Sequence, residues 1–422
     1  MLMNRKVKIW ILLLFLIVTI FLTLSRHSKS GIQNYHCEIW ADKAGYYVYL
    51  PSLFVYGFRA DEMPPNIDKK TGNGFKIVDG KIKTKYTYGV ALMQIPFFLV
   101  GHYLSRYFGS NCDGFSILYH KIIDISAVSY SFFSLIIFYL VLIRYFCAVT
   151  SILTLICIYL GTNLFYYSIF ETGMSHIYSF FLFICFVYLG AFVANGRKVH
   201  FFTLGLIIGL IIAVRPINIM FLPVFFILNR LKFIDIKKNL TNFALMAVTV
   251  VVVIVPQLIY WKYSHGSYFH YSYEGESFSN AFEPKLMQLL FSTNNGLFVY
   301  SPIAIFILVG FFLYFKKIPR ESVFMSIYFL FVSYIFSSWH DWSYGCSYGC
   351  RPYVEYYSIL AIPFGFFVDK LNTKFLFKPL LILSLLVFVF YNQKLMFSYD
   401  GCWYGGTWDW AELLKLLLGP TK

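Results

Sequence analysis

Nearly all residues of this sequence that could transfer a proton or bind an anion stand in short polar stretches between long apolar runs. In chain order they are Glu38, Asp42 and Lys43; Lys81, Lys83, Lys85 and Tyr86; Glu171, Ser175 and His176; Arg215; His265, His270, Glu274 and Glu276; and His340, Asp341 and Arg351. A carboxylate can take a proton from a hydroxyl group, and an arginine can hold a phosphate through two parallel hydrogen bonds. Whether these stretches act together depends on the side of the apolar runs on which each one lies.

The composition is that of a polytopic membrane protein. Of the 422 residues, 59% are hydrophobic and 13% are charged, and the mean hydropathy of +0.65 is far from that of a soluble globular domain. The net charge of +15 comes from short Lys and Arg clusters at the ends of apolar runs, where such clusters set topology and contact anionic lipids. Nucleic-acid binding would need a clustered basic face or tail, so we expect no nucleic-acid partner.

The apolar runs predict transmembrane helices. The first, 9–24, follows Arg5, Lys6 and Lys8 and is not followed by a small-residue cleavage site, so we predict an uncleaved first helix with a cytoplasmic N-terminus. Further runs lie at 88–104, 122–143, 147–165, 176–194, 200–214, 217–228, 241–261, 296–315, 322–338, 353–369 and 375–391. The short runs 200–214 and 217–228 flank Arg215-Pro216 and predict tilted or broken helices that meet at the outer side.

The run at 88–104 decides the side of every later loop, and the positive-inside rule resolves it. If this run does not span, the later cytoplasmic loops hold 13 positive charges and the external side holds 7. The cytoplasmic ones are Arg144, Arg197, Lys198, Arg230, Lys232, Lys237, Lys238, Lys316, Lys317, Arg320, Lys370, Lys374 and Lys378; the external ones are Arg215, Lys262, Lys285, Arg351, Lys394, Lys415 and Lys422. We therefore predict that 88–104, with Pro96 in its middle, lies on or dips into the outer leaflet.

The predicted protein is all-α, with about eleven transmembrane helices in a single domain over residues 1–422, an internal N-terminus and an external C-terminus. A long first external loop (25–120) carries interfacial helices. Further external pieces are 262–295 and the tail 392–422, where CWYGGTWDW predicts an aromatic interfacial segment. In this topology the external loops hold nearly all the potentially reactive residues. Such one-sidedness favours a functional site over charges that only solvate loop ends.

Asp42 is the best single candidate for a catalytic carboxylate. It lies in CEIWADKAGYYVYLPSLFVYG, where YYVYLPSLFVYG predicts an amphipathic surface helix. A carboxylate at this place could accept a proton from an acceptor hydroxyl. The alternative is an N-cap role, because Asp42 precedes a helical run.

Taken in order, these elements resemble a known family. An acidic residue early in the first external loop and a tyrosine-rich helix are followed by K-Y-x-Y-G-x-x-L-x-x-x-P-F at 85–97. Glu171, Ser175-His176, Arg215-Pro216, GLFVYSP at 296–302 and W-x-x-W-x-Y-G-x-S-Y-G-x-R at 339–351 come next. The chain resembles the polyprenyl-phosphate-sugar-dependent membrane glycosyltransferases of the GT-C fold, near the protein O-mannosyltransferases (glycosyltransferase family 39) and the aminoarabinose transferases that modify lipid A.

The resemblance implies a mechanism and a place. A sugar on a polyprenyl phosphate would be moved, with inversion, to a hydroxyl of an acceptor lipid, glycan or protein, at the external face of a bacterial inner membrane. By carry-over Asp42 is the catalytic base and Glu171 the second acidic position. Residues expected to bind the lipid phosphate or the sugar are Lys85, Tyr86, His176, Arg215, Trp339, His340, Asp341, Trp342 and Arg351. Arg351 is the first candidate for the leaving phosphate.

Two departures from the family pattern matter. The K-P-P of the lipid A transferases is Lys85-Tyr86-Thr87 here, and Glu171 is followed by Thr172-Gly173 rather than by a second carboxylate. The acidic pair that holds a divalent ion in oligosaccharyltransferases is therefore missing, and we expect neither a required metal nor another cofactor. HDWSYG is similar to their W-W-D-Y-G motif, but that motif belongs to a large soluble domain that this sequence lacks, so it is not carried over.

The cysteines leave several readings open. Cys37, Cys112, Cys346, Cys350 and Cys402 fall in external stretches where disulfides can persist, and five is an odd number. In the repeated Ser-Tyr-Gly-Cys at 343–350, the cysteines could bond to each other or to Cys402, or form a zinc site with His340. Its glycines permit tight turns, and its tyrosines with Trp342 could face lipid headgroup, sugar or prenyl chain.

Two rival functions remain. A lipid-linked glycan polymerase or ligase also has many spans and external Arg and His residues, but it usually carries its large external loop late, whereas here the large loop comes first. A non-enzymatic lipid or glycan transporter predicts inverted repeats and charges buried in the middle of helices. The sequence shows no such repeat, and the middles of its predicted spans are apolar.

Overall fold

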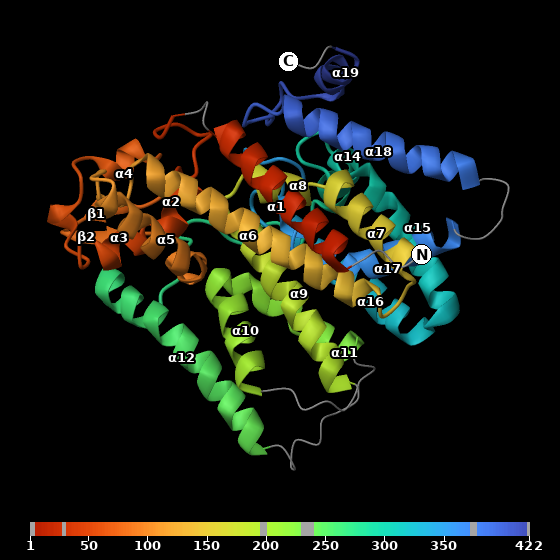
Figure 1. Ribbon diagram of the computed structural model, residues 1–422, viewed down its shortest axis with the longest axis horizontal. Helices are drawn as coiled ribbons and strands as arrows, with labels where there is room; N and C mark the ends of the chain where they lie inside the picture. The colour runs from red at the N-terminus through yellow and green to blue at the C-terminus, as the bar shows by residue number, and fades with distance from the viewer. Residues whose placement is uncertain (1–4, 28–30, 195–200, 229–239, 372–377, 420–422) are drawn as a thin grey trace.

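The computed structural model describes residues 5–27, 31–194, 201–228, 240–371 and 378–419, which form an all-α fold with one two-stranded ribbon (Figure 1). The longer helices are α1 (Arg5–His27), α5 (Gly89–Tyr107), α6 (Ile117–Leu142), α7 (Ala148–Gly161), α9 (Ser175–Ala194), α10 (Phe201–Val214), α12 (Leu240–His265), α15 (Ile305–Lys317), α16 (Pro319–Ser337), α17 (Tyr357–Leu371) and α18 (Lys378–Ser398). The all-α prediction is confirmed, because each predicted apolar run coincides with helix.

Four of these helices, α1 from Ile9, α6, α12 and α18, are long and apolar enough to cross a membrane, and shorter apolar helices lie beside them. Their outer surfaces stay apolar: Val248, Val251 and Val252 of α12 and Leu383 and Leu386 of α18 are exposed. Such surfaces suit a multi-pass membrane protein, since lipid tails solvate them. Several charges used to predict topology lie outside the described residues, namely Arg197, Lys198, Arg230, Lys232, Lys237, Lys238, Lys374 and Lys422.

Three predicted runs are interrupted rather than continuous. The run 296–315 consists of α14 (Leu297–Tyr300), η3 (Pro302–Ala304) and α15, because Pro302 has no N–H to continue the first helix. The run 147–165 ends as α7 at Gly161, and α8 (Leu164–Ile169) begins after a bend. The run 217–228 divides into η2 (Pro216–Phe221) and α11 (Val224–Leu228), which agrees with the predicted broken helix near Arg215.

The segment between α1 and α5 folds into small elements gathered at one end of the molecule (Figure 1). They are α2 (Asp42–Tyr47), α3 (Tyr49–Phe54), η1 (Ala60–Glu62), α4 (Ile67–Lys70) and the antiparallel strands β1 (Lys76–Val78) and β2 (Lys81–Lys83). The predicted amphipathic surface helix is wrong, because α2 and α3 are buried from Lys43 to Ser52. The buried tyrosine hydroxyls make hydrogen bonds within the protein: Tyr47 donates to the Gly114 carbonyl (2.6 Å) and Tyr49 to the Tyr86 carbonyl (2.6 Å).

Helix α5 packs along α6 and also contacts α2, α3 and α10. The tail segment after α18 folds back on the bundle, with the rings of Trp403 and Trp408 stacked 4.5 Å apart and Trp403 packed against Tyr399. Trp403 is therefore buried by protein. The remaining elements are α13 (Leu286–Phe291), η4 (Arg351–Tyr353) and α19 (Trp410–Leu418).

Helices α15 and α17 approach closely at a glycine. A Cβ added to Gly310 would lie 2.0 Å from the carbonyl oxygen of Pro363, a backbone atom that cannot rotate away. Pro363 lies inside α17, in the buried interior. Small residues allow such backbone contact between membrane helices, where dispersion rather than the hydrophobic effect holds helices together.

We therefore expect Gly310→Ala to destabilise the bundle. Overpacking of this kind costs about 1–3 kcal/mol, and the variant should unfold several degrees below the wild type in a thermal scan of the detergent-solubilised protein. Gly406→Ala is the matched control, since nothing lies within 4 Å of its added Cβ. Equal melting temperatures for the two variants would contradict the close α15–α17 contact.

Candidate functional site

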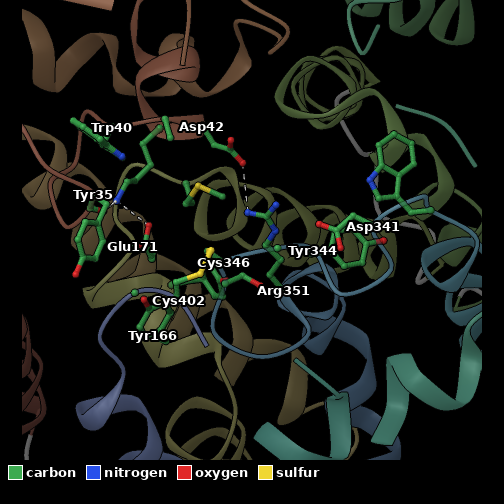
Figure 2. A pocket seen from close by; sticks show the side chains of 18 of the residues that line it. Tyr35, Trp40, Asp42, Tyr166, Glu171, Asp341, Tyr344, Cys346, Arg351 and Cys402 are labelled. Atoms are coloured by element: carbon green, nitrogen blue, oxygen red, sulfur yellow. Dashed lines mark hydrogen bonds and ion pairs between the residues drawn. A yellow bond between two sulfur atoms is a disulfide. The ribbon is translucent and has the colours of Figure 1, made fainter. Parts of the chain in front are cut away.

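A cavity of about 560 Å³ lies where five polar segments meet at one end of the helices. These segments are the chain from Tyr35 to Lys43, the turn between α8 and α9, the loop after α12, the loop between α16 and α17, and the chain after α18, with Lys85 completing the wall. Figure 2 shows acidic, basic and aromatic side chains facing the same space. The aromatic lining is Tyr35, Trp40, Tyr166, Tyr167, Trp339 and Tyr344.

Three ion pairs bridge different segments across the cavity. Arg351 Nη1 lies 3.5 Å from Asp42 Oδ2, and Lys43 Nζ lies 3.0 Å from Glu171 Oε2 (Figure 2). Lys85 Nζ lies 2.6 Å from Glu276 Oε1. Asp42 and Arg351 are separated by 309 residues in sequence, so only the fold brings them together. The pairing across segments means that each loop holds its neighbour in place.

Asp42 opens to the cavity with 37% of its side chain accessible. Burial raises the pKa of its carboxyl, but the Arg351 guanidinium, a hydrogen bond from Tyr86, and the ammonium groups of Lys85 and Lys43 outweigh burial and hold this pKa below its usual range. Asp42 is therefore ionised at neutral pH. It does not cap a helix: α2 begins at Asp42 itself, and its N-cap residue Ala41 makes no side-chain cap bond.

The loop between α16 and α17 delivers Arg351 to the cavity, and a buried asparagine holds its shape. The Asn295 amide group donates to the carbonyls of Ser343 and Gly345 (2.9 Å each) and to Ser347 Oγ (3.0 Å). Its carbonyl oxygen accepts from the Gly349 N–H at 3.2 Å. Sequence reasoning missed Asn295, whose only signal was its place just before GLFVYSP.

The predicted turns of this loop are present, since Gly345 and Gly349 both have positive φ. Its two tyrosines differ: Tyr344 lines the cavity, whereas Tyr348 is fully buried among other tyrosines and does not face a substrate. Asp341 also faces the cavity and accepts a hydrogen bond from Ser343 Oγ at 2.6 Å. Trp342 does not line the cavity, unlike Trp339 and His340.

Three further predicted site residues, Tyr86, His176 and Arg215, do not line the cavity. Glu355 binds two of them: its Oε1 is 2.9 Å from Arg215 Nη1, and its Oε2 is 2.9 Å from His176 Nδ1. His176 is 2% exposed and cannot contact a substrate in this arrangement. Tyr86 is likewise buried, with its hydroxyl turned to Asp42. Glu355 was missed because YVEYYSIL reads as the start of an apolar helix.

A second buried charge cluster supports the segment that follows α1. Glu38 Oε1 forms an ion pair with His27 Nδ1 at 2.5 Å, and Glu38 Oε2 is hydrogen-bonded to His120 Nδ1 at 2.6 Å. Asp124, one turn further along α6, accepts from Thr172 Oγ1 at 2.7 Å. Asp124 is buried near the start of the run 122–143 rather than in its middle.

Two contacts hold His27. Its Nε2 lies 3.0 Å from the carbonyl oxygen of Ile169, which can only accept, so Nε2 carries a proton. Its Nδ1 forms an ion pair with the Glu38 carboxylate at 2.5 Å, and in this pair His27 is an imidazolium. Burial raises the pKa of Glu38, but the hydrogen bonds from His120 and His27 outweigh burial and hold this pKa well below its usual range.

The cysteine question is resolved by one disulfide at the cavity rim, between Cys346 and Cys402 (Figure 2). It ties the Arg351 loop to the chain after α18. Cys37, Cys112 and Cys350 are free, so the expectation that at least one of these five cysteines is unpaired is confirmed. The zinc reading is wrong, because the Cys346 sulfur is bonded and Cys350 is buried away from solvent.

Chemically, the cavity offers an ionised carboxylate beside a guanidinium, a lysine on the opposite wall and an aromatic lining. Such a set can remove a proton from a hydroxyl, bind a phosphate and stack against a sugar ring. It contains Asp42, Lys85, Glu171, Trp339, His340, Asp341 and Arg351 of the predicted residues. No protein-family model, curated protein or solved structure matches this chain.

Glu38→Gln should destabilise the protein strongly, because it removes the carboxylate that the buried His27 and His120 both contact. Breaking a buried pair costs about 3–5 kcal/mol, so a thermal scan at neutral pH should show a drop of several degrees. Since the pKa of Glu38 is depressed in the folded protein, its stabilisation is complete above its unfolded pKa of about 4.3 and is lost as the pH falls below that value. The difference in melting temperature between Glu38→Gln and the wild type should therefore become smaller as the pH falls.

Glu62→Gln is the control for this prediction, because Glu62 pairs with Arg59 on the surface, where both side chains are exposed. Its melting temperature should equal that of the wild type. An unchanged melting temperature in Glu38→Gln at neutral pH would disprove the buried charge pair.

Loss of the disulfide should loosen the cavity rim. A cross-link over a 56-residue separation contributes about 2–4 kcal/mol, so Cys402→Ser should unfold at lower temperature, whereas Cys112→Ser, at a free cysteine, should not. Peptide mapping under non-reducing conditions should recover the peptides of Cys346 and Cys402 joined. Recovery of Cys346 joined to Cys350 would contradict the observed pairing.

Proposed function

We propose that this chain is an integral membrane glycosyltransferase of the GT-C type, which moves a sugar from a polyprenyl phosphate to an acceptor hydroxyl. The observation that carries the proposal is the Asp42–Arg351 pair, whose two groups face one cavity from segments far apart in sequence. A base and a phosphate-binding cation are the two groups that this displacement needs.

The order of the helices supports a site on the external side. Counting α1, α6, α7, α9, α10, η2 with α11, α12, α15, α16, α17 and α18 as spans gives eleven crossings. The cavity-lining segments then follow α1, α12, α16 and α18 and precede α9 and α17, so all of them lie on one side. The basic residues Arg144, Lys316, Lys317, Arg320 and Lys370 lie at the other ends of their helices, which suits a cytoplasmic side. The cavity is then external.

In the proposed reaction the acceptor oxygen attacks the anomeric carbon while its proton passes to Asp42. The bond between that carbon and the phosphate oxygen breaks with inversion, and its electron pair leaves with the polyprenyl phosphate. Arg351 stabilises the charge that develops on this phosphate, with Lys85 across the cavity as a second cation. Glu171, paired with Lys43, orients the α2 segment that carries Asp42.

The resting pair also explains how the base is activated. Arg351 is the strongest of the groups that lower the pKa of Asp42. When a donor phosphate draws the guanidinium away and adds negative charge, the pKa of Asp42 must rise, which makes it a better base. The separation of 3.5 Å indicates a pair that a phosphate can open.

The test is to incubate the purified protein with a panel of polyprenyl-phosphate sugars and acceptors and to measure release of polyprenyl phosphate. Asp42→Asn should slow release by about 10²–10⁴-fold, because it removes the base, while leaving donor binding. Arg351→Ala should both weaken donor binding and lower the rate of release. Arg351→Lys should restore only part of the donor binding and of the rate, since an ammonium cannot form the bidentate contact.

Asp61→Asn and Arg106→Ala are matched controls, because both residues are exposed and lie outside the cavity. They should release polyprenyl phosphate at the wild-type rate. Undiminished release in Asp42→Asn and Arg351→Ala would reject the assigned site. Transport of a lipid-linked glycan without release would favour the transporter alternative, and formation of a repeating polymer would favour the polymerase.

A further inference from the structure

Two histidines and a glutamate meet where α12 ends and the following loop begins. One ligand atom from each of His265, His270 and Glu274 lies within 4.8 Å of the other two. The imidazole rings are stacked with centroids 3.7 Å apart, so a shared ion requires one ring to turn until the lone pairs of both rings converge. Neither ring lines the cavity, so this cluster is separate from the proposed catalytic site.

The protonation of His265 is fixed by a neighbouring serine. Ser264 Oγ donates its only proton to the Tyr260 carbonyl at 2.8 Å, and it therefore accepts from His265 Nδ1 at 2.7 Å. With the proton on Nδ1, the Nε2 atom of His265 keeps a free lone pair. A hydrogen bond of this kind on one ring nitrogen is what orients a metal-binding histidine.

The second histidine has a ring nitrogen in need of a partner. His270 Nε2 is buried and makes no hydrogen bond in the described part of the chain. It lies 3.4 Å from Glu274 Oε1 without the alignment of a hydrogen bond. This separation equals the edge of a zinc tetrahedron, because Zn–N and Zn–O bonds of about 2.0–2.2 Å place neighbouring ligand atoms roughly 3.3–3.5 Å apart.

We propose that His265, His270 and Glu274 bind a divalent transition-metal ion, Zn²⁺ by its ligand preference. Two imidazoles and one carboxylate suit this ion, and water can supply the fourth ligand because Glu274 is 76% exposed. Lys81 and Lys83 also act on His265 and oppose a cation. The Glu274 carboxylate supplies the negative charge that offsets them.

The ion would fasten the loop after α12 to the end of that helix. The same loop reaches the cavity within a few residues: Ser272 Oγ donates to the Lys85 carbonyl at 2.6 Å, and Glu276 pairs with Lys85 Nζ. A metal at the cluster therefore holds the cavity wall that carries Glu276. It takes no part in proton transfer or phosphate binding, so it does not depend on the proposed function.

The test uses the full-length protein carrying an affinity tag without histidine, stripped with chelator and titrated with Co²⁺. The wild type should bind one equivalent with the strong visible absorption of tetrahedral Co²⁺, and Zn²⁺ should displace it. His270→Ala and Glu274→Gln should abolish this absorption, and Ser264→Ala should weaken binding by about 10–100-fold. His340→Ala, at a histidine of the cavity, should bind as the wild type does.

Absence of stoichiometric uptake by the wild type would overturn the proposal, as would equal uptake by wild type and Glu274→Gln. Loss of uptake in His340→Ala alone would place the metal in the cavity and also overturn it. Glu274 is exposed, so its variant should fold even where His270→Ala does not. Thermal scans should show Zn²⁺ raising the melting temperature of the wild type and leaving that of Glu274→Gln unchanged.

Discussion

The structure depends on opposite charges that meet across loops at one end of the helices. Asp42 pairs with Arg351, Lys43 with Glu171 and Lys85 with Glu276, and each pair joins two segments far apart in the chain. Behind them, Glu38 joins α1 to α6 through two histidines. A charge in such a half-buried place is costly without a partner. The pairs therefore select one arrangement of the loops, and the cavity is the space that this arrangement leaves open.

These pairs differ in how readily a substrate can break them. Lys43 is 5% exposed and contacts Glu171 closely, so it serves to hold α2. Arg351 is more accessible and lies farther from its carboxylate, and its aromatic neighbour Tyr344 lies 6.0 Å from the guanidinium. An incoming phosphate group competes best for the looser cation. Residues of similar chemistry therefore fall into two groups: those whose packing supports the cavity, and those that are loose enough to bind a ligand in it.

Much of the fold could be predicted from the apolar runs. A helix in lipid must form its backbone hydrogen bonds within itself, so it is recognisable in the sequence by its length and apolar composition. The break near Arg215-Pro216 was also predicted, since proline lacks a donor, whereas the break at Pro302 was not. The buried first loop was not. Its tyrosines look amphipathic in sequence, but their hydroxyls bond to carbonyls of distant segments, as Tyr47 does to Gly114. The periodicity of one segment does not show which distant carbonyl groups its tyrosines contact.

The candidate site, like the fold, could be predicted only in part. Asp42, Lys85 and Arg351 were identifiable because charges in short loops between apolar runs stand out, and the cavity includes all three. His120 and Asp124 lie inside α6, and Glu355 lies in the turn just before α17, where a lone polar residue in an apolar run is read as packing. Each has its partner on another element: Glu355 holds Arg215 and His176, two basic residues that the sequence had placed in the cavity. The role of a charged residue depends on which partner it contacts. The sequence does not show that contact, because the two residues are far apart in the chain.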